Sequence, residues 1–304
     1  MSGADDGREA GFRKVPAYRV AGDALVAEQC LVVGEDALSI DVEGIGSYTL
    51  MWTPTEPREA AAGYSREDGL LADAGNPEAL ALAAGFCFTE GLIAGLDDIR
   101  SIAACPDTPG VITVQLVDPH KVKPRRRNVT INSSCGICGG RDAIDDGLLN
   151  LSPVRDLLRV RAGQLGLMMA KMRQRQSVFQ QTGGSHAAAV FSGEGDILAV
   201  AEDLGRHNAL DKVIGACVLN RCDLSACGVL LSSRMSFEMV VKAVRAGFEL
   251  IAAISAPTSL AIEIAERYGV TLCGFVREER VTVYTHPRRL QAAAVVAAGD
   301  KIPC

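Results

Sequence analysis

Two thiols three positions apart are the sharpest chemical signal in this sequence. Cys135 and Cys138 lie in the segment 132–140, which also holds three glycines. Glycine lets a backbone adopt left-handed conformations and approach a ligand closely, so such a loop can expose Cys135 with Cys138 in reach. The pattern is consistent with a nucleophilic or sulfur-carrying thiol pair, with half of a zinc site, or with two buried thiols. Serine and glycine neighbours make a poor core.

The zinc alternatives are weaker. A four-ligand zinc site needs a second ligand pair, and the candidates Cys222 and Cys227 are loosely spaced. Zinc deaminases need a His-x-Glu motif and a Pro-Cys-x-x-Cys motif. None of the four histidines has a glutamate two places later, and Ser134 precedes Cys135. The sequence therefore lacks the proton shuttle of that class.

Five cations lie in the seven residues 121–127, just before the thiols. This run can lower the pKa of a nearby thiol, or bind a phosphate or an acidic partner. A solvated loop is the alternative, since it is the usual outcome for a run of like charges. A glycine pair and His186 lie in 182–186 and can hold an anion. The alternative there is a turn into a strand, with His186 bonded to backbone.

Polar turns follow several predicted strands in the second half. Asp203, Arg206 and His207 lie between a strand and a helix, and Arg234 and the segment 255–259 occupy the same place in later units. Ligands of open α/β sheets bind at the carboxyl ends of strands, and a helix N-terminus with an arginine suits a phosphate. We therefore expect one extended anion pocket, although each turn alone could be helix capping.

Composition sets the class of protein. The chain has 304 residues, a formal charge of −6, 48% hydrophobic and 5% aromatic residues. A full core is expected, which excludes global disorder. The acidic balance and few aromatics argue against nucleic acid as a partner. No secretory leader and no apolar run of about 18 residues is seen, so we expect a cytoplasmic protein, with no membrane association and ten reduced cysteines.

These motifs need elements to position them. Short β-prone runs lie at 31–33, 38–42 and 48–52, a helix is expected over 76–93 with Asn76 as cap, and a strand over 111–117. A long helix is expected over 152–175. Strands and helices then alternate, which predicts a largely parallel sheet; the expected elements are 197–201, 206–218, 229–231, 236–247, 250–254, 259–268, 270–275 and 281–284.

The expected fold class is therefore α/β, with a smaller N-terminal β-containing α+β domain. Its predicted parts are a disordered N-terminus at 1–14, the α+β domain with the Cys-x-x-Cys loop at 15–140, an α/β domain at 141–290 and a tail at 291–304.

In this order, the motifs resemble the formate dehydrogenase accessory sulfurtransferases, the FdhD family. The matching segments are 90–93, 132–140, 182–188, 203–212, 233–242, 255–260 and 274–277.

The resemblance implies a three-layer C-terminal α/β domain like that of cytidine deaminases, without zinc or any other permanently bound metal. It implies a cytoplasmic sulfur carrier that accepts persulfide sulfur from a cysteine desulfurase. The sulfur passes to the molybdenum or tungsten bis-molybdopterin guanine dinucleotide cofactor, which the catalytic subunit of formate dehydrogenase requires. It also implies a homodimer. A non-catalytic chaperone that delivers this cofactor is the alternative from another class, and a four-cysteine zinc-binding module is a third.

The resemblance also assigns residues. Cys135 would carry the persulfide and Cys138 would be its partner thiol. The cofactor-binding stretch maps to Phe275, Val276, Arg277, Glu278, Glu279 and Arg280. We expect Arg206, Arg234 and Arg277 to hold phosphates and Asp203 to read the guanine, with His186 and His207 beside them.

Overall fold

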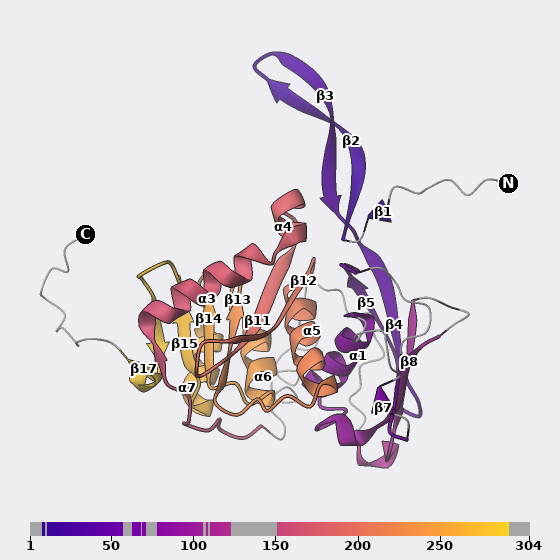
Figure 1. Ribbon diagram of the computed structural model, residues 1–304, viewed down its shortest axis with the longest axis vertical. Coiled ribbons are helices and arrows are strands. Elements are labelled where there is room, and N and C mark those ends of the chain that lie inside the picture. Colours follow the sequence, from indigo (N-terminus) through magenta and orange to yellow (C-terminus); the bar gives the residue numbers. More distant parts are fainter. Residues whose placement is uncertain are drawn as a thin grey trace, which may run out of the picture.

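The structure, a computed structural model, contains two six-stranded sheets, and a long two-stranded ribbon projects from the body (Figure 1). The described residues are 8–9, 11–56, 63–67, 69–70, 78–105, 108, 110–122 and 151–291. The predicted thiols Cys135 and Cys138 lie outside them, as do Asn76 and most of the basic run.

The N-terminal sheet has the order β5-β4-β9-β8-β6-β7. Its strands form because apolar and polar residues alternate: in β4, Leu38, Ile40 and Val42 are buried and Asp41 is exposed. The strands are β4 (Asp36–Val42), β5 (Gly46–Trp52), β6 (Gly63–Ser65), β7 (Gly69–Leu70), β8 (Ile99–Ala104) and β9 (Val111–Leu116). Helix α1 (Glu78–Thr89) packs on this sheet, with the Phe86 ring 5.0 Å from that of Tyr48. Two 3-10 turns, η1 (Leu96–Asp98) and η2 (Pro119–Lys121), precede β8 and follow β9.

The C-terminal sheet has the order β12-β11-β13-β14-β15-β16. Its strands are β11 (His186–Ser192), β12 (Ile197–Asp203), β13 (Cys227–Leu231), β14 (Leu250–Ala253), β15 (Thr271–Gly274) and β16 (Thr282–Thr285). Every residue of β13, β14 and β15 is buried. These strands are therefore covered on both faces, as their near-continuous apolar runs indicate.

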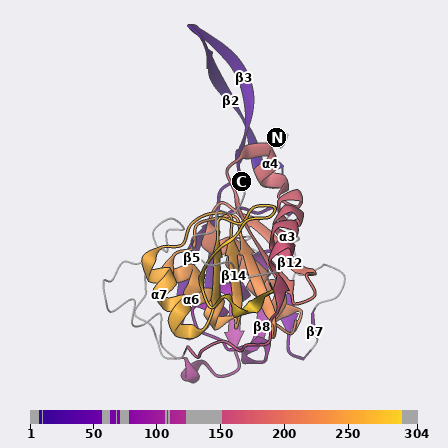
Figure 2. The same ribbon diagram turned by 90° about the vertical axis from the view of Figure 1, so that its left-hand side faces the viewer.

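Helices cover both faces of this sheet (Figures 1 and 2). Helix α3 (Ala162–Gln174) buries Leu165, Met168 and Met172 against one face. The other face is covered by α5 (Arg206–Leu219), α6 (Phe237–Arg245) and α7 (Ser259–Tyr268). This is the expected three-layer arrangement. Short elements complete it: α4 (Ser177–Thr182), the paired strands β10 (Val160–Arg161) and β17 (Leu290–Gln291), and η3 (Pro287–Arg289).

The prediction of a largely parallel sheet is wrong. Only β13–β14 and β14–β15 are parallel among the described pairings of this sheet, and the other three are antiparallel. The reason is local: β11 and β12 form a hairpin through a tight turn, in which Gly195 has φ 88° and its N–H donates to Ser192 O at 3.0 Å. No helix separates these two strands, so they run in opposite directions.

The predicted helix over 152–175 is also too long, because α3 begins only at Ala162. Residues 151–159 are instead non-helical. Glu249 Oε2 accepts hydrogen bonds from the N–H groups of Leu157 and Leu158 at 2.8 Å, and Val154 N–H donates to Tyr268 O at 2.9 Å. These partners are distant in sequence, so local helical pattern could not reveal them.

The ribbon consists of β2 (Phe12–Ala21) and β3 (Ala24–Val33), preceded by the short β1 (Arg8–Glu9). Phe12 therefore belongs to a strand, within the segment expected to be disordered. Tyr18, Val20 and Leu25 are 74%, 71% and 72% exposed. They share one face of the ribbon, because Val20 pairs with Leu25 and strand side chains alternate. The ribbon thus carries an apolar strip at its tip.

Helices α1 and α5 join the two sheets through glycines. A Cβ on Gly85 would lie 1.8 Å from Asp211 O, and one on Gly215 would lie 1.8 Å from Ala81 O. The helix backbones therefore touch, which only glycine permits. A single hydrophobic cluster runs from the N-terminal sheet through α1 and α5 to the C-terminal sheet.

This contact predicts the effect of Gly215→Ala. The added methyl would overlap a backbone carbonyl, and forcing atoms into a packed core lowers the free energy of unfolding by about 1–3 kcal/mol, occasionally more. Gly163→Ala in α3 is the matched control, since no atom lies within 4 Å of its Cβ position; it should be neutral or stabilise by up to about 1 kcal/mol. Chemical denaturation measures both, and equal effects would contradict the packing described.

Candidate functional site

The loops that follow the parallel strands meet at one edge of the C-terminal sheet. The loop after β13 pairs with the loop after β14: Met235 N–H donates to Ala256 O at 3.1 Å, and Thr258 N–H donates to Met235 O at 3.0 Å. After β15, Phe275 N–H donates to Ser255 O at 3.3 Å. The predicted convergence of these turns is therefore present.

Three helices begin at this edge: α5 at Arg206, α6 at Phe237 and α7 at Ser259. The N-terminus of a helix carries a partial positive charge and free N–H groups. Arginines stand beside them, because Arg206 opens α5 and Arg234 lies exposed two residues before the Ser236 cap of α6. The edge is therefore suited to bind an anion.

His186 lies within this group of cations. It begins β11 and pairs with Asp203, the last residue of β12. Burial lowers the pKa of His186 below its ordinary value of 6.5, and the positive charge of Arg206 lowers it further. His207 and Arg234 act in the same direction, against Asp203. Five residues that the sequence singled out from three separate segments are thus brought together.

Arg206 has a feature of its own. Its side chain is half-buried, and its buried Nε has no hydrogen-bond partner among the described residues. A buried donor without a partner is unfavourable by about 1–3 kcal/mol. An anionic ligand at this edge would supply the acceptor.

Asp203 has an internal role that the sequence did not indicate. It is fully buried, and both of its oxygens are occupied. Oδ1 accepts from Gly205 N at 2.8 Å and from Asn208 Nδ2 at 2.9 Å. Oδ2 accepts from Thr53 N at 3.0 Å and lies 2.7 Å from Lys212 Nζ. The expectation that Asp203 reads a guanine therefore does not fit; Asp203 fixes the turn that presents Arg206.

Lys212 extends this network into the N-terminal half. Its Nζ donates to Thr53 O at 2.7 Å and to Glu78 Oε1 at 2.6 Å, and lies 5.0 Å from the ring centre of Trp52. Lys212 is 1% exposed. Thr53 and Glu78 were missed from the sequence, because their partners are more than a hundred residues away. A buried glutamate and lysine that are distant in sequence form no local motif, so the sequence gives no signal that they pair.

A second buried network lies below the start of α6. Lys242 Nζ contacts Asp211 Oδ2 at 2.7 Å, Thr89 Oγ1 at 2.8 Å and Glu90 Oε1 at 3.6 Å. Burial raises the pKa of Asp211, while the Lys242 charge opposes that change. Above it, His207 Nε2 lies 3.0 Å from Glu238 Oε2. His207, in the first turn of α5, is thus within ion-pair distance of Glu238 at the start of α6.

The stretch 275–280, which was predicted to bind the cofactor, follows β15 and contains both exposed and buried residues. Phe275 has a left-handed φ of 52° and is 47% exposed, so an aromatic ring is held at the strand end in a conformation that such residues rarely adopt. Val276 is buried. Arg277 Nη1 donates to Ile254 O at 2.9 Å. The residues exposed to solvent are Phe275, Arg277, Glu278, Glu279 and Arg280.

Helix α3 supports this turn from behind. A Cβ on Gly166 would lie 2.3 Å from Glu278 O and 2.8 Å from Arg277 O, so the turn rests directly on the α3 backbone. Arg277 N–H also donates to Arg280 O at 2.8 Å, which closes the turn. The stretch is therefore a supported loop at the same edge as the cations.

In the part of the chain that the structure describes, no group of three or more His, Cys, Asp or Glu residues could hold a metal ion. Nor is any described helix long and apolar enough to cross a membrane.

Comparison with known proteins places these features in context. A model of the FdhD/NarQ family matches residues 76–291. A Sulfur carrier protein FdhD from Mycolicibacterium paratuberculosis is 37% identical over 290 residues, which cover 91% of this chain and 98% of that protein. One from Saccharolobus solfataricus is 40% identical over 210 residues, covering 69% and 78%.

A solved structure has the same fold. The crystal structure of a candidate formate dehydrogenase accessory protein from Desulfotalea psychrophila superimposes with a TM-score of 0.70 at 23% identity. The superposition covers 92% of this chain and 100% of the Desulfotalea psychrophila chain.

The environment of His186 predicts a pH dependence. Because its pKa is lowered in the fold, protonation favours the unfolded chain. The contribution of neutral His186 to stability is present above pH 6.5 and is lost as the pH falls through the lowered folded pKa. His186→Gln should therefore flatten the fall in the free energy of unfolding below pH 6.5. Urea titrations across this range measure it. His120→Gln, at an exposed position, should keep the wild-type profile; a His186→Gln profile equal to wild type would contradict the account.

Proposed function

Because the chain belongs to the FdhD/NarQ family, we propose that it is a sulfur carrier for formate dehydrogenase. It accepts persulfide sulfur from a cysteine desulfurase and transfers it to the bis-molybdopterin guanine dinucleotide cofactor. This molybdenum or tungsten compound is the substrate of the transfer, and the catalytic subunit of formate dehydrogenase receives it afterwards. Relatives named Sulfur carrier protein FdhD, at 37% and 40% identity, support the proposal.

The observation that carries the nucleotide half of the proposal is the cation cluster at the carboxyl edge. A guanine dinucleotide presents phosphates, and Arg206 and Arg234 can bind them by charge-assisted hydrogen bonds. Arg206 Nε lies buried without a described acceptor. Neutral His186 beside them can accept or donate one further hydrogen bond. The exposed Phe275 ring offers a face on which a purine can stack.

The sulfur half of the proposal rests on Cys135 and Cys138. The Cys135 thiolate attacks the outer sulfur of the donor persulfide, and the donor cysteine leaves as a thiolate. Cys135 then holds a persulfide. When Cys138 attacks Cys135 Sγ, the outer sulfur leaves as sulfide towards the bound metal, and a Cys135–Cys138 disulfide remains. A reducing thiol restores the pair.

The proposal also includes the location of the protein and its oligomeric state. We place the protein in the cytoplasm, where a desulfurase and an unfinished formate dehydrogenase are both available. We also propose a homodimer. The exposed apolar strip of Tyr18, Val20 and Leu25 supports association, because isolated two-stranded ribbons are marginally stable in water.

Arg234→Ala should weaken nucleotide binding without unfolding the protein, because Arg234 is exposed. A charge-assisted hydrogen bond contributes about 1.5–3 kcal/mol, so the Kd for GDP should rise about tenfold to a hundredfold. Isothermal titration calorimetry measures it. Arg19→Ala removes an exposed arginine of the ribbon and should leave the Kd unchanged; equal losses in both variants would refute a site at the sheet edge.

Cys135→Ala should abolish the maturation of formate dehydrogenase, because no persulfide can then be held at the loop. The assay is formate oxidation in cells that lack the endogenous carrier. Cys30→Ala, at a half-buried thiol of the ribbon, is the control and should support full activity. Full activity with Cys135→Ala would instead favour a chaperone that delivers the cofactor without transferring sulfur.

A further inference from the structure

Another pair of thiols meets where α5 ends. Arg221 has a left-handed φ of 52°, and its N–H donates to Val218 O at 3.1 Å. The N–H of Cys222 donates to Cys217 O at 2.9 Å. These two bonds form a Schellman motif, which is frequently accompanied by a contact between the side chains at the first and last of the bonded positions. In this chain those side chains are the thiols of Cys217 and Cys222.

The two thiols differ in exposure. Cys217 is 1% exposed and belongs to the main hydrophobic cluster, whereas Cys222 is open to solvent. Burial, the charge of Cys222 and a hydrogen bond between the two thiols raise the pKa of Cys217 to about 12. Cys222 is therefore the thiol of the pair that a solute can reach first.

A third thiol nearby, that of Cys227, already has a hydrogen-bond partner. Cys227 is buried, and its Sγ donates to Asp223 O at 3.6 Å. Burial raises its pKa to about 11. Cys217, whose carbonyl accepts the Cys222 N–H, is therefore the better candidate for the partner of Cys222.

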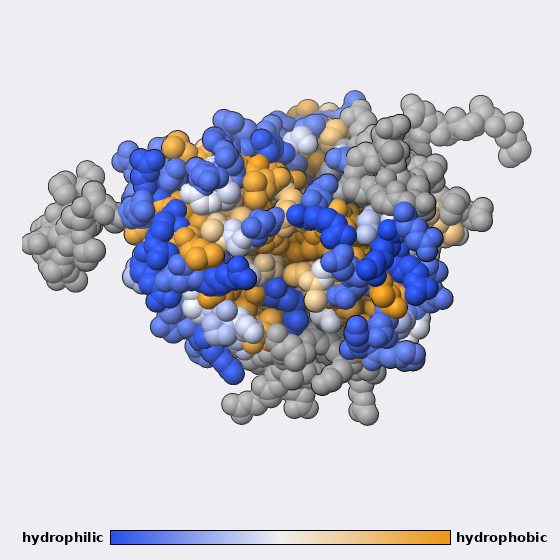
Figure 3. Space-filling model, turned by 60° about the horizontal axis from the view of Figure 1, so that its bottom comes forward, coloured by the Kyte–Doolittle hydropathy of each residue, from blue (hydrophilic) through white to orange (hydrophobic). Residues whose placement is uncertain are grey.

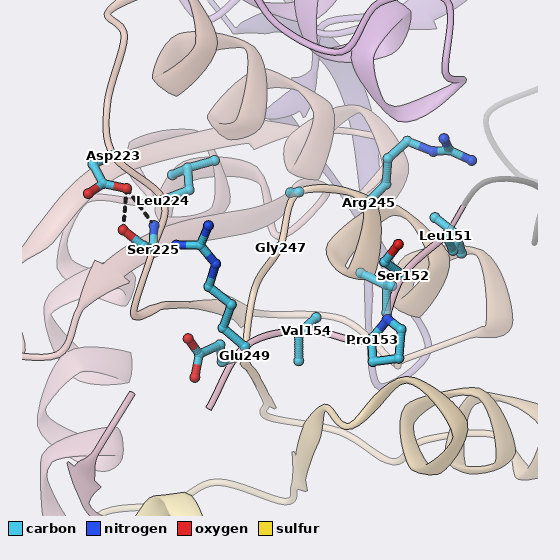
Figure 4. Close-up of a pocket in the computed structure, with 13 residues that line it drawn as sticks. Leu151, Ser152, Pro153, Val154, Asp223, Leu224, Ser225, Arg245, Gly247 and Glu249 are labelled. Carbon is cyan, nitrogen blue, oxygen red and sulfur yellow. Dashed lines mark hydrogen bonds between the residues drawn. The ribbon is translucent and has the colours of Figure 1, made fainter. Parts of the chain in front are cut away.

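A pocket of about 420 Å³ lies beside the segment that follows Cys222, on the sheet edge where α6 ends; Figure 4 shows the residues that line it. Residues 223–225, which directly follow Cys222, form one of its walls. Arg155 and Arg245 are among its lining residues, and its Glu249 is bonded to Arg289 at 3.1 Å. Figure 3 shows this face, where hydrophobic residues lie in hollows between hydrophilic ones. The pocket therefore holds the cations Arg155 and Arg245 together with the carboxylates Asp223 and Glu249, beside the segment that follows Cys222.

We propose that Cys222 and Cys217 form a second sulfur-handling site, which accepts a sulfane sulfur atom from a small polysulfide anion and discharges it as sulfide. The Cys222 thiolate attacks the terminal sulfur of the polysulfide. The donor S–S bond breaks, and the donor leaves one sulfur shorter with the electron pair. Cys222 then carries a persulfide.

Cys217 completes the reaction. Its sulfur attacks Cys222 Sγ, the bond to the sulfane sulfur breaks, and the Cys217 proton leaves with the released hydrosulfide. The sulfane sulfur gains two electrons, which the two thiols lose as they form a disulfide. An added dithiol reductant restores both thiols. This inference rests on the proposed function in one respect: a sulfur carrier is exposed to compounds that donate sulfane sulfur.

The test uses the full chain with Cys135→Ala and Cys138→Ala, so the loop thiols cannot contribute. Inorganic tetrasulfide is the probe, and the readouts are released sulfide and a non-reducing tryptic map. Trypsin cleaves after Arg221, so the disulfide links the peptides 213–221 and 222–234. We expect this linked pair to form together with sulfide, and dithiol reductant to abolish it.

Three variants in that background sharpen the test. Cys217→Ala should leave a persulfide on peptide 222–234, one sulfur atom heavier, and reduce released sulfide to the level without protein. Cys222→Ser, at an exposed position, should lose both products without disturbing the fold. Cys227→Ser should retain the linked peptides. The proposal is overturned if no linkage forms, if the disulfide lies within peptide 222–234, or if Cys222→Ser releases sulfide as before. The maturation assay with Cys135→Ala reads the loop function separately.

Discussion

A buried ion pair between Asp203 and Lys212 joins the two halves of the molecule through its bonds to Thr53 and Glu78, and the candidate site is built on it. The two charged groups lie 2.7 Å apart and are almost wholly excluded from solvent. Removing one partner of such a pair is unfavourable by about 3–5 kcal/mol, because the other charge is left buried and unpaired. The other partners of the two groups are Thr53, Glu78, Gly205, Asn208 and the carbonyl of Glu202. These bonds hold the turn before α5 in place.

The rest of the site follows from that constraint. The bonded turn holds the start of α5, and backbone contact with α1 through Gly85 and Gly215 holds its middle. The Lys242–Asp211 network fixes α6 in the same way. The carboxylates of Asp203 and Asp211 are thus paired inside the molecule, while Arg206 and Arg234 stand at the edge beside three helix N-termini, with Glu278 and Glu279 exposed on the neighbouring turn.

Local signals predicted some elements well. The helix expected over 259–268 is present with those bounds, because Thr258 caps its start and Gly269 ends it with φ 76°. The gathering of His186, Arg206 and Arg234 followed from a general property of sheet edges. The sheet order, the extended segment 151–159 and the internal role of Asp203 could not be predicted, since each depends on a partner distant in sequence. An aspartate looks the same in a sequence whether its carboxylate is buried in an internal network or binds a ligand.

The central claim is that this edge of the sheet binds the guanine nucleotide end of the cofactor. A crystal structure of the protein with GDP tests it most directly. The account predicts density for the phosphates within hydrogen-bond distance of Arg206 and Arg234, with Asp203 still bonded to Lys212. A nucleotide bound elsewhere, with Arg206 Nε still lacking an acceptor, would contradict it.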